Sequence, residues 1–137
     1  MKLKDLRNKI PKDLTKVEFS KTECIWISDY WDGIKSGMVE YQNELCWLEM
    51  IQENEKWKKG EWYRRFALLK LSKEQIEKEM EVHKDFQRFV GIHWDNKQLK
   101  TPPAFEKGRM DEFYDEHSEY VKSRPFEENE VIGWMEN

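Results

Sequence analysis

The sequence predicts a single-domain α+β fold, an antiparallel β-meander of four to five strands packed by one long amphipathic helix and a shorter helix. Its length of 137 residues is typical of a single domain. Short runs of β-branched and aromatic residues, separated by turn signals, fill residues 15–71, and helical patterns follow in residues 72–137. Aromatic residues make up 14% of a chain that is 38% charged. Disordered chains are poor in aromatics, so we expect a core of few, large side chains.

Residues 1–14 are predicted to form a short amphipathic helical arm. Leu3, Leu6 and Ile10 recur at helical spacing, and Pro11 ends the pattern. A frayed terminal arm is the alternative.

Four runs are predicted to be strands, at residues 24–27, 37–41, 45–51 and 62–71. Asp32-Gly33 is a turn signal between the first two, and the other connections are short or charged, so neighbouring strands should be antiparallel. The third and fourth strands carry apolar residues on both faces. A sheet covered on one side would alternate, so we expect its second face to be covered by the chain or by a partner.

The long helix is predicted over residues 73–90. Ser72 and Gln75 have the spacing of a capping box, and Gly91 marks the helix end. Apolar side chains recur along one face of this segment, as expected of a helix that packs on a sheet. The same periodicity predicts a shorter helix over residues 110–121, and residues 131–135 are a plausible edge strand.

Several classes of protein do not fit the sequence. It holds no apolar run long enough to cross a membrane and no secretory signal peptide. It also lacks the glycine-rich phosphate loops and the nucleophile elbow of common enzymes. Cys24 and Cys46 both lie in apolar runs, so buried, reduced thiols in a cytoplasmic protein are expected, with a disulfide between them as the alternative.

The net charge of −4 is unevenly distributed. Residues 1–23 carry seven Lys or Arg and four Asp or Glu, whereas residues 101–137 carry four and ten. Proteins that bind nucleic acid usually show a basic stripe, so nucleic acid is a poor fit as the main partner. The acidic C-terminal third suits a basic protein surface better.

Candidate chemistry centres on three histidines. His83 lies on the apolar face of the long helix and is expected at the edge of the core. His93 and Asp95 could bind a metal or form an acid–base pair if His83 or His117 came near, but nothing in their spacing requires it. The sequence therefore assigns no catalytic residue, no metal site and no cofactor.

Candidate binding residues are aromatic or acidic. The aromatic turn contributes Tyr30, Trp31 and Asp32, and Trp57 lies in a polar loop where burial is difficult. Packing over the end of the sheet is the alternative for the turn. The outer face of the shorter helix is a candidate docking surface for a basic partner, and a face that is only solvated is the alternative. Its acidic residues are Asp111, Glu112, Asp115, Glu116 and Glu119. Glu127, Glu128 and Glu130 would extend that face.

The leading hypothesis is a non-enzymatic intracellular binding protein that engages a protein partner, in the manner of bacterial toxin-immunity or phage counter-defence inhibitors. A domain that binds a small ligand in a Trp-lined pocket between sheet and helices is the alternative. An enzyme using His83, His93 or His117 with carboxylates comes third. Self-association is left open.

Overall fold

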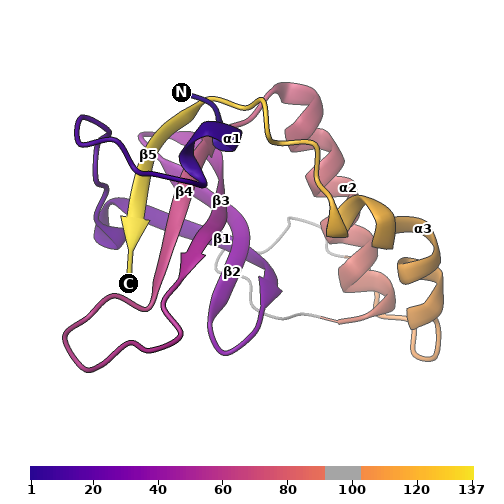
Figure 1. Cartoon of the computed structure of the whole chain (residues 1–137). Coiled ribbons are helices and arrows are strands. Elements are labelled where there is room, and N and C mark those ends of the chain that lie inside the picture. The colour runs from indigo at the N-terminus through magenta and orange to yellow at the C-terminus, as the bar shows by residue number, and fades with distance from the viewer. Residues whose placement is uncertain (92–102) are drawn as a thin grey trace.

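The chain forms a five-stranded antiparallel sheet with two helices on one side (Figure 1). The computed structural model describes residues 1–91 and 103–137. In chain order its elements are α1 (Leu3–Leu6), η1 (Phe19–Lys21), β1 (Thr22–Tyr30), β2 (Ile34–Tyr41), β3 (Glu44–Glu53), β4 (Arg64–Lys70), α2 (Lys73–Phe89), α3 (Met110–Lys122) and β5 (Val131–Glu136). The predicted α+β class and antiparallel sheet are confirmed.

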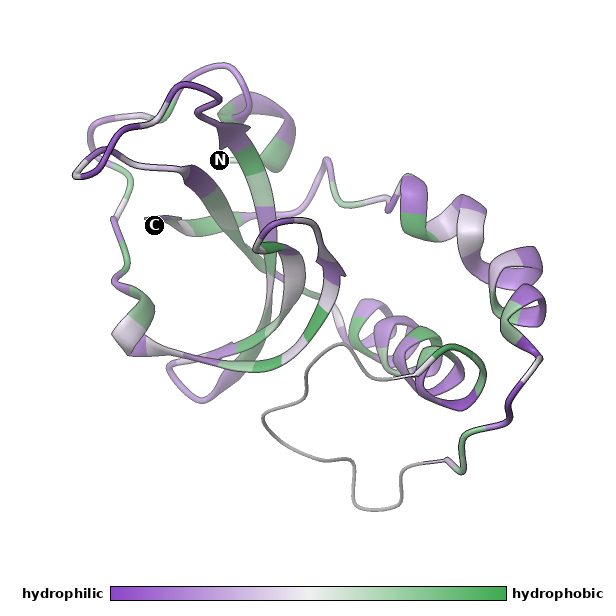
Figure 2. Ribbon diagram, turned by 90° about the horizontal axis from the view of Figure 1, so that it is seen from below, coloured by the Kyte–Doolittle hydropathy of each residue, from purple (hydrophilic) through white to green (hydrophobic). Residues whose placement is uncertain are grey.

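The strands follow one another in the sheet in the order of the sequence, so the sheet is a meander. It curls over, as the view from below shows (Figure 2). Residues 15–17 return beside the last strand: the Val17 N–H donates to the carbonyl of Trp134 at 2.8 Å, and the Trp134 N–H donates to the carbonyl of Thr15 at 3.0 Å. The segment that precedes β1 therefore pairs with β5, at the opposite edge of the sheet.

Both faces of the sheet are buried by the chain itself. One face packs against α1, α2 and Phe126, with Trp26 and Trp47 among its fully buried side chains. The other face lies inside the curl and contains Phe66 and Leu68, closed by Val17. This arrangement explains why the third and fourth strands are apolar on both sides.

The long helix begins as predicted. The Gln75 N–H donates to the Ser72 hydroxyl at 3.1 Å, and the Ser72 N–H donates to the Gln75 side chain at 2.9 Å, which completes the capping box. The helix contacts the sheet through His83, whose ring stacks on Trp26 with centroids 4.2 Å apart. The shorter helix packs on α2, where Phe113 meets Phe86 edge to face.

The predicted N-terminal helix is wrong in length, because only Leu3–Leu6 is helical. Leu3 and Leu6 are buried in the core beside the sheet, as their spacing indicated. The Leu3 N–H donates to the carbonyl of Asn129, and the Lys4 N–H donates to the carbonyl of Glu127. The chain then changes direction, because residues 15–17 lie along β5. Tertiary contacts therefore decide the conformation of residues 7–14, where local periodicity favoured a helix.

Several strand boundaries also differ from the prediction, among them the start of β2 at Ile34 where residue 37 was expected. The first strand continues to Tyr30, beyond its predicted end at residue 27, and carries register shifts in its pairing with β2. The fourth strand begins at Arg64, because Trp62 and Tyr63 belong to the preceding loop.

The two cysteines are not disulfide-bonded, and the geometry forbids a disulfide between them. Cys24 and Cys46 both pair with Val39, from opposite sides, so one whole strand separates them. Two inter-strand spacings amount to roughly 9.5 Å, beyond the ~7 Å that a disulfide can bridge. Burial raises the pKa of the Cys46 thiol to about 11.

No helix in the described ranges, 1–91 and 103–137, has the length and apolar character to span a bilayer.

Candidate protein-binding site

The turn between β1 and β2 exposes two large aromatic side chains. Trp31 is 77% exposed and Tyr30 is 53% exposed. Asp32 and Gly33 complete the turn with φ values of 51° and 121°, in the left-handed region. Asp tolerates that region and Gly adopts it freely, which explains why this pair forms the turn.

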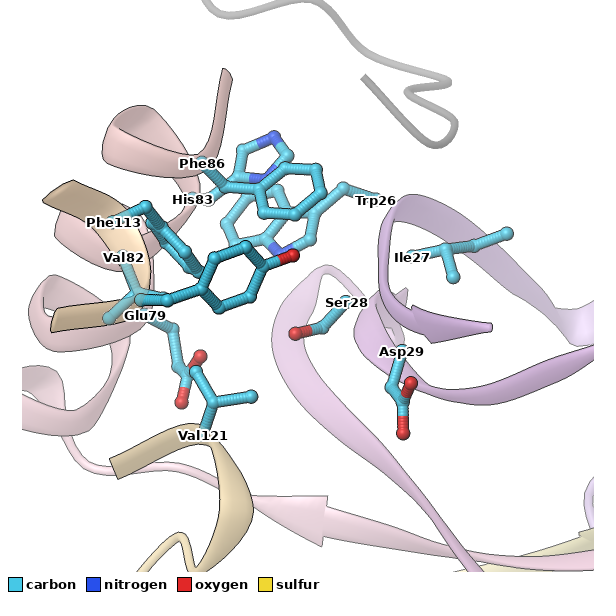
Figure 3. A pocket seen from close by; sticks show the side chains of 11 residues that line it. Trp26, Ile27, Ser28, Asp29, Glu79, Val82, His83, Phe86, Phe113 and Val121 are labelled. Carbon is cyan, nitrogen blue, oxygen red and sulfur yellow. The ribbon is translucent and has the colours of Figure 1, made fainter. Parts of the chain in front are cut away.

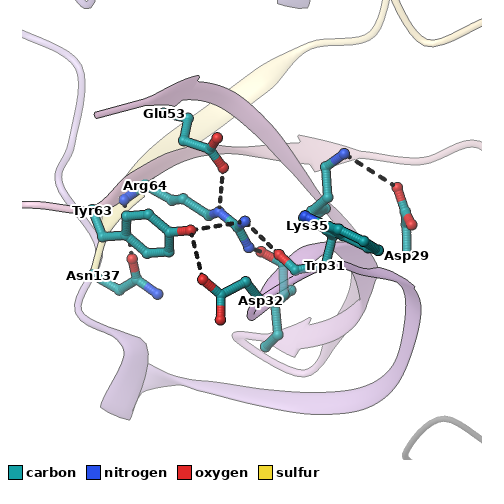
Figure 4. A network of polar contacts seen from close by, with 9 residues as sticks. Asp29, Trp31, Asp32, Lys35, Glu53, Tyr63, Arg64 and Asn137 are labelled. Carbon is teal, nitrogen blue, oxygen red and sulfur yellow. Dashed lines mark hydrogen bonds and ion pairs between the residues drawn. The ribbon is translucent and has the colours of Figure 1, made fainter. Parts of the chain in front are cut away.

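A buried arginine fixes the backbone of this turn (Figure 4). The Arg64 side chain is only 1% exposed, and its guanidinium donates to the carbonyls of Trp31 and Ile34, the latter at 3.1 Å. Its Nε donates to the Glu53 carboxylate at 2.8 Å. The rigid fork of donors on arginine can hold all three acceptors at once.

Tyr63 links the turn to the loop between β3 and β4. Its ring lies under the Arg64 guanidinium at 4.6 Å, and its hydroxyl donates to Asp32 at 3.4 Å. The ring of Trp57, a residue that is 48% exposed, lies 5.3 Å from the ring of Tyr63. Tyr63 thus brings Asp32 of the turn near Trp57 of the loop. We call the turn and these neighbours the aromatic tip: Tyr30, Trp31, Asp32, Trp57 and Tyr63.

Sequence reasoning missed Arg64 and Tyr63, because both contact the turn across about 30 residues of sequence. The available signal was an arginine on the strand face that also carries Phe66 and Leu68, where a charge needs buried partners.

The predicted acidic residues belong to a separate element, α3, which packs beside α2 (Figure 1). All five predicted residues are exposed: Asp111, Glu112, Asp115, Glu116 and Glu119. Glu112 is paired with Arg109, which holds the pKa of its carboxyl below the usual value.

Two of the three glutamates that were expected to extend this face are paired with basic residues of the same chain. Glu127 is paired with Arg7 at 2.7 Å, and Glu128 with both Lys2 and Lys4 at 2.6 Å. The hydrogen bonds from the two lysines lower the pKa of Glu128 to about 2. Part of the charge asymmetry of the sequence is therefore neutralised within the chain.

The histidines do not form a shared site in the described part of the chain. His83 is buried against Trp26, and burial lowers its pKa to about 4. His117 is buried between the helices, with Nε2 2.8 Å from a carboxylate oxygen of Asp85 and 3.8 Å from one of Glu116. The possible metal-binding atoms of Asp85, Glu116 and His117 lie within 4.8 Å of one another. However, His117 Nε2, the atom that would bind an ion there, is already hydrogen-bonded to Asp85. His93 and Asp95 lie outside the described residues.

A buried ion pair joins the helices to the sheet. Arg124 donates to the buried Glu79 at 2.7 Å and to the Ser28 hydroxyl at 2.8 Å, and Tyr120 donates to Glu79 at 2.7 Å. The pKa of Tyr120 is raised above its ordinary value, mainly by burial and secondly by the hydrogen bond to Glu79. These contacts fix the end of α3 against both α2 and β1.

A small cavity lies beside this ion pair, between β1, α2 and α3 (Figure 3). Trp26 and His83 are among its lining residues, so it corresponds to the predicted pocket between sheet and helices. His117 does not line it, so this cavity brings no second described histidine beside His83.

Comparison with family models, with curated proteins and with solved structures finds no match to this chain.

Proposed function

We propose that the protein is a non-enzymatic binding protein that engages and blocks a protein partner through the aromatic tip, as immunity or counter-defence proteins do. One observation carries the proposal: Trp31 is 77% exposed on a turn whose carbonyls are held by a buried arginine. Two cysteines without a disulfide are consistent with a reducing, cytoplasmic setting.

The chemistry of the tip is that of an interface anchor. Tryptophan and tyrosine are enriched among the residues that dominate binding energy, because they bury much area and keep a polar group. A turn that is already fixed loses little conformational entropy on binding, which favours affinity. Arg64 supplies this rigidity, since it holds the backbone on both sides of Asp32 and Gly33.

The exposed acidic face of α3 supports a basic partner. Its charges would act on the encounter between the proteins, because charges at the rim of an interface accelerate association more than they slow dissociation. In this proposal the tip supplies most of the affinity, and α3 contributes to the rate of association.

The experiment is affinity capture from the native host with quantitative mass spectrometry, using three baits in parallel. The wild type is compared with Trp31→Ala and with Phe105→Ala, a matched control that also removes an exposed aromatic ring (58% exposed) outside the tip. We expect a partner that is retained by the control and lost by Trp31→Ala. An identical set of captured proteins for all three baits would exclude the tip as the binding surface.

The isolated partner then allows a kinetic test. Trp31→Ala should raise the dissociation rate and cost about 2 kcal/mol or more. Neutralising the five acidic residues of α3 should instead slow association and weaken its salt dependence. An association rate that responds to neither the charge removal nor salt contradicts the role of α3.

A further inference from the structure

The cavity between β1, α2 and α3 has the lining of a ligand site. Its volume is about 150 Å³, and an apolar cavity of about that volume in another protein accepts a benzene-sized molecule. None of Tyr30, Trp31, Asp32, Trp57 and Tyr63 lines it, so an inference from the cavity is independent of the aromatic tip.

Aromatic rings form one side of the cavity. Phe113 stands nearly perpendicular to both Phe86 and Tyr114, with centroids 5.3 Å apart in each pair. The Trp26 ring, stacked on His83, belongs to the same side (Figure 3). Rings that meet edge to face in this way enclose a concave space from more than one direction.

The polar groups that line the cavity are acceptors or neutral. Asp29 and Ser28 lie across from the rings, and Glu79 lies at one end (Figure 3). No lysine or arginine is among the lining residues of the described chain. His83 carries no charge at neutral pH, because burial lowers its pKa to about 4.

The nearest cationic side chains, Arg124 and Lys35, do not add a positive charge to the lining of the cavity. Arg124 directs its donors to Glu79, Ser28 and the Val121 carbonyl, and is not itself a lining residue. Lys35 approaches Asp29 only at 3.9 Å, and the Asp29 side chain remains 54% exposed. The Asp29 carboxylate is therefore accessible to a ligand.

We propose that this cavity binds a small organic cation, a methylated ammonium group, with the rings of Trp26, Phe86, Phe113 and Tyr114 around its methyl groups and the Asp29 carboxylate opposite its charge. Aromatic faces attract cations through their quadrupole, and cages of such rings recognise quaternary ammonium groups. A primary ammonium or a metal ion would lose hydration that apolar walls cannot replace. An anion would find no cationic donor among the described lining residues.

The first test compares choline with 3,3-dimethylbutan-1-ol, which has the same shape but no charge. Binding is followed by titration calorimetry and by the Trp26 indole signal in NMR spectra. We expect choline to bind about fivefold or more tightly than the alcohol. Equal binding would show an apolar pocket only, and no binding of choline at millimolar concentration would overturn the proposal.

Two variants locate the site. Tyr114→Ala and Asp29→Asn should each weaken choline binding by about fivefold. Met110→Ala is the matched control, since Met110 lies on the same helix with similar exposure (49% against 44% for Tyr114) but does not line the cavity. Choline affinity that survives both Tyr114→Ala and Asp29→Asn would place the ligand elsewhere and overturn the assignment.

The same cationic group can belong to a free small molecule or to a methylated lysine in a protein. A trimethyllysine peptide and its unmodified counterpart, titrated beside choline, distinguish these sources. Preference for the trimethylated peptide over both choline and the unmodified peptide indicates a protein ligand, and preference for choline indicates a free molecule. Equal affinity for the two peptides would contradict recognition of the methyl groups.

Discussion

At the scale of single residues, Arg64 determines the shape of the aromatic tip. Its guanidinium binds two backbone carbonyls and a carboxylate, and it lies over Tyr63. A substituted Gly33 would press against this group, because a Cβ there would lie 3.1 Å from Arg64 Nη1 at a φ of +121°. The turn, the arginine and the glycine therefore form one unit.

Replacing Arg64 with methionine should destabilise the fold by about 2–4 kcal/mol. The change keeps most of the apolar stem but removes the donors from two partly buried carbonyls, each worth roughly 1–3 kcal/mol. Urea unfolding followed by fluorescence measures the loss. Arg65→Met is the control, because Arg65 is partly exposed and should cost less. Equal losses for the two variants would show that the buried guanidinium has no special role.

His83 should make stability depend on pH. Its pKa in the folded protein is about 4, below the ordinary value of about 6.5, because burial disfavours the imidazolium. Between these values the unfolded chain binds a proton that the folded chain does not, so the free energy of unfolding should fall as pH drops from about 6.5 to about 4. The full loss is on the order of 3 kcal/mol.

The measurement is urea unfolding of the wild type and of His83→Gln at several pH values from 7.5 to 4.5. The variant cannot titrate at this position, so the difference between the two proteins isolates the histidine from the carboxylates. That difference should shrink as the pH falls. A difference that stays constant over this range would show that His83 is protonated equally in the folded and unfolded chains.

At the scale of elements, local signals predicted most of the secondary structure. The capping box of Ser72 and Gln75 placed the start of α2, and Asp32-Gly33 placed the first turn, because both signals depend on neighbours in the sequence. The predicted helix over residues 1–14 was too long, since the conformation of this segment depends on pairing with the far end of the chain. The pairing of Arg64 with the turn and the cavity beside Trp26 depend on long-range contacts in the same way, which sequence periodicity does not encode.

The cap of α2 gives a prediction at this scale. Ser72→Ala should cost about 0.5–2 kcal/mol, because the Gln75 N–H loses its acceptor at 3.1 Å. Ser72→Asp should retain most of the stability, since aspartate is an equally good cap. Unfolding in urea compares the three proteins. An aspartate variant as unstable as the alanine variant would mean that capping is not the cause.

At the scale of the whole molecule, the two ends of the chain stabilise each other. The basic N-terminal residues pair with Glu127 and Glu128, and residues 15–17 hydrogen-bond with Trp134 in β5. The curled sheet is closed over its inner core at this point, where Val17 joins the buried cluster. The exposed ion pairs contribute little individually, so backbone pairing and the burial of Val17 should dominate this closure.

Gly133 tests the closure, because the N-terminal segment lies directly over it. A Cβ at Gly133 would lie 2.8 Å from a methyl carbon of Val17 and 3.1 Å from the Thr15 carbonyl oxygen. Gly133→Ala should therefore destabilise the protein by roughly 1–3 kcal/mol, the usual cost of overpacking. Val17→Ala alone should also destabilise it, through lost burial. The double variant should be more stable than the sum of the two losses predicts, because removing the Val17 methyl groups relieves the nearest clash. Urea unfolding of the four proteins completes this cycle, and strictly additive losses would show that the segment does not pack on β5 in solution.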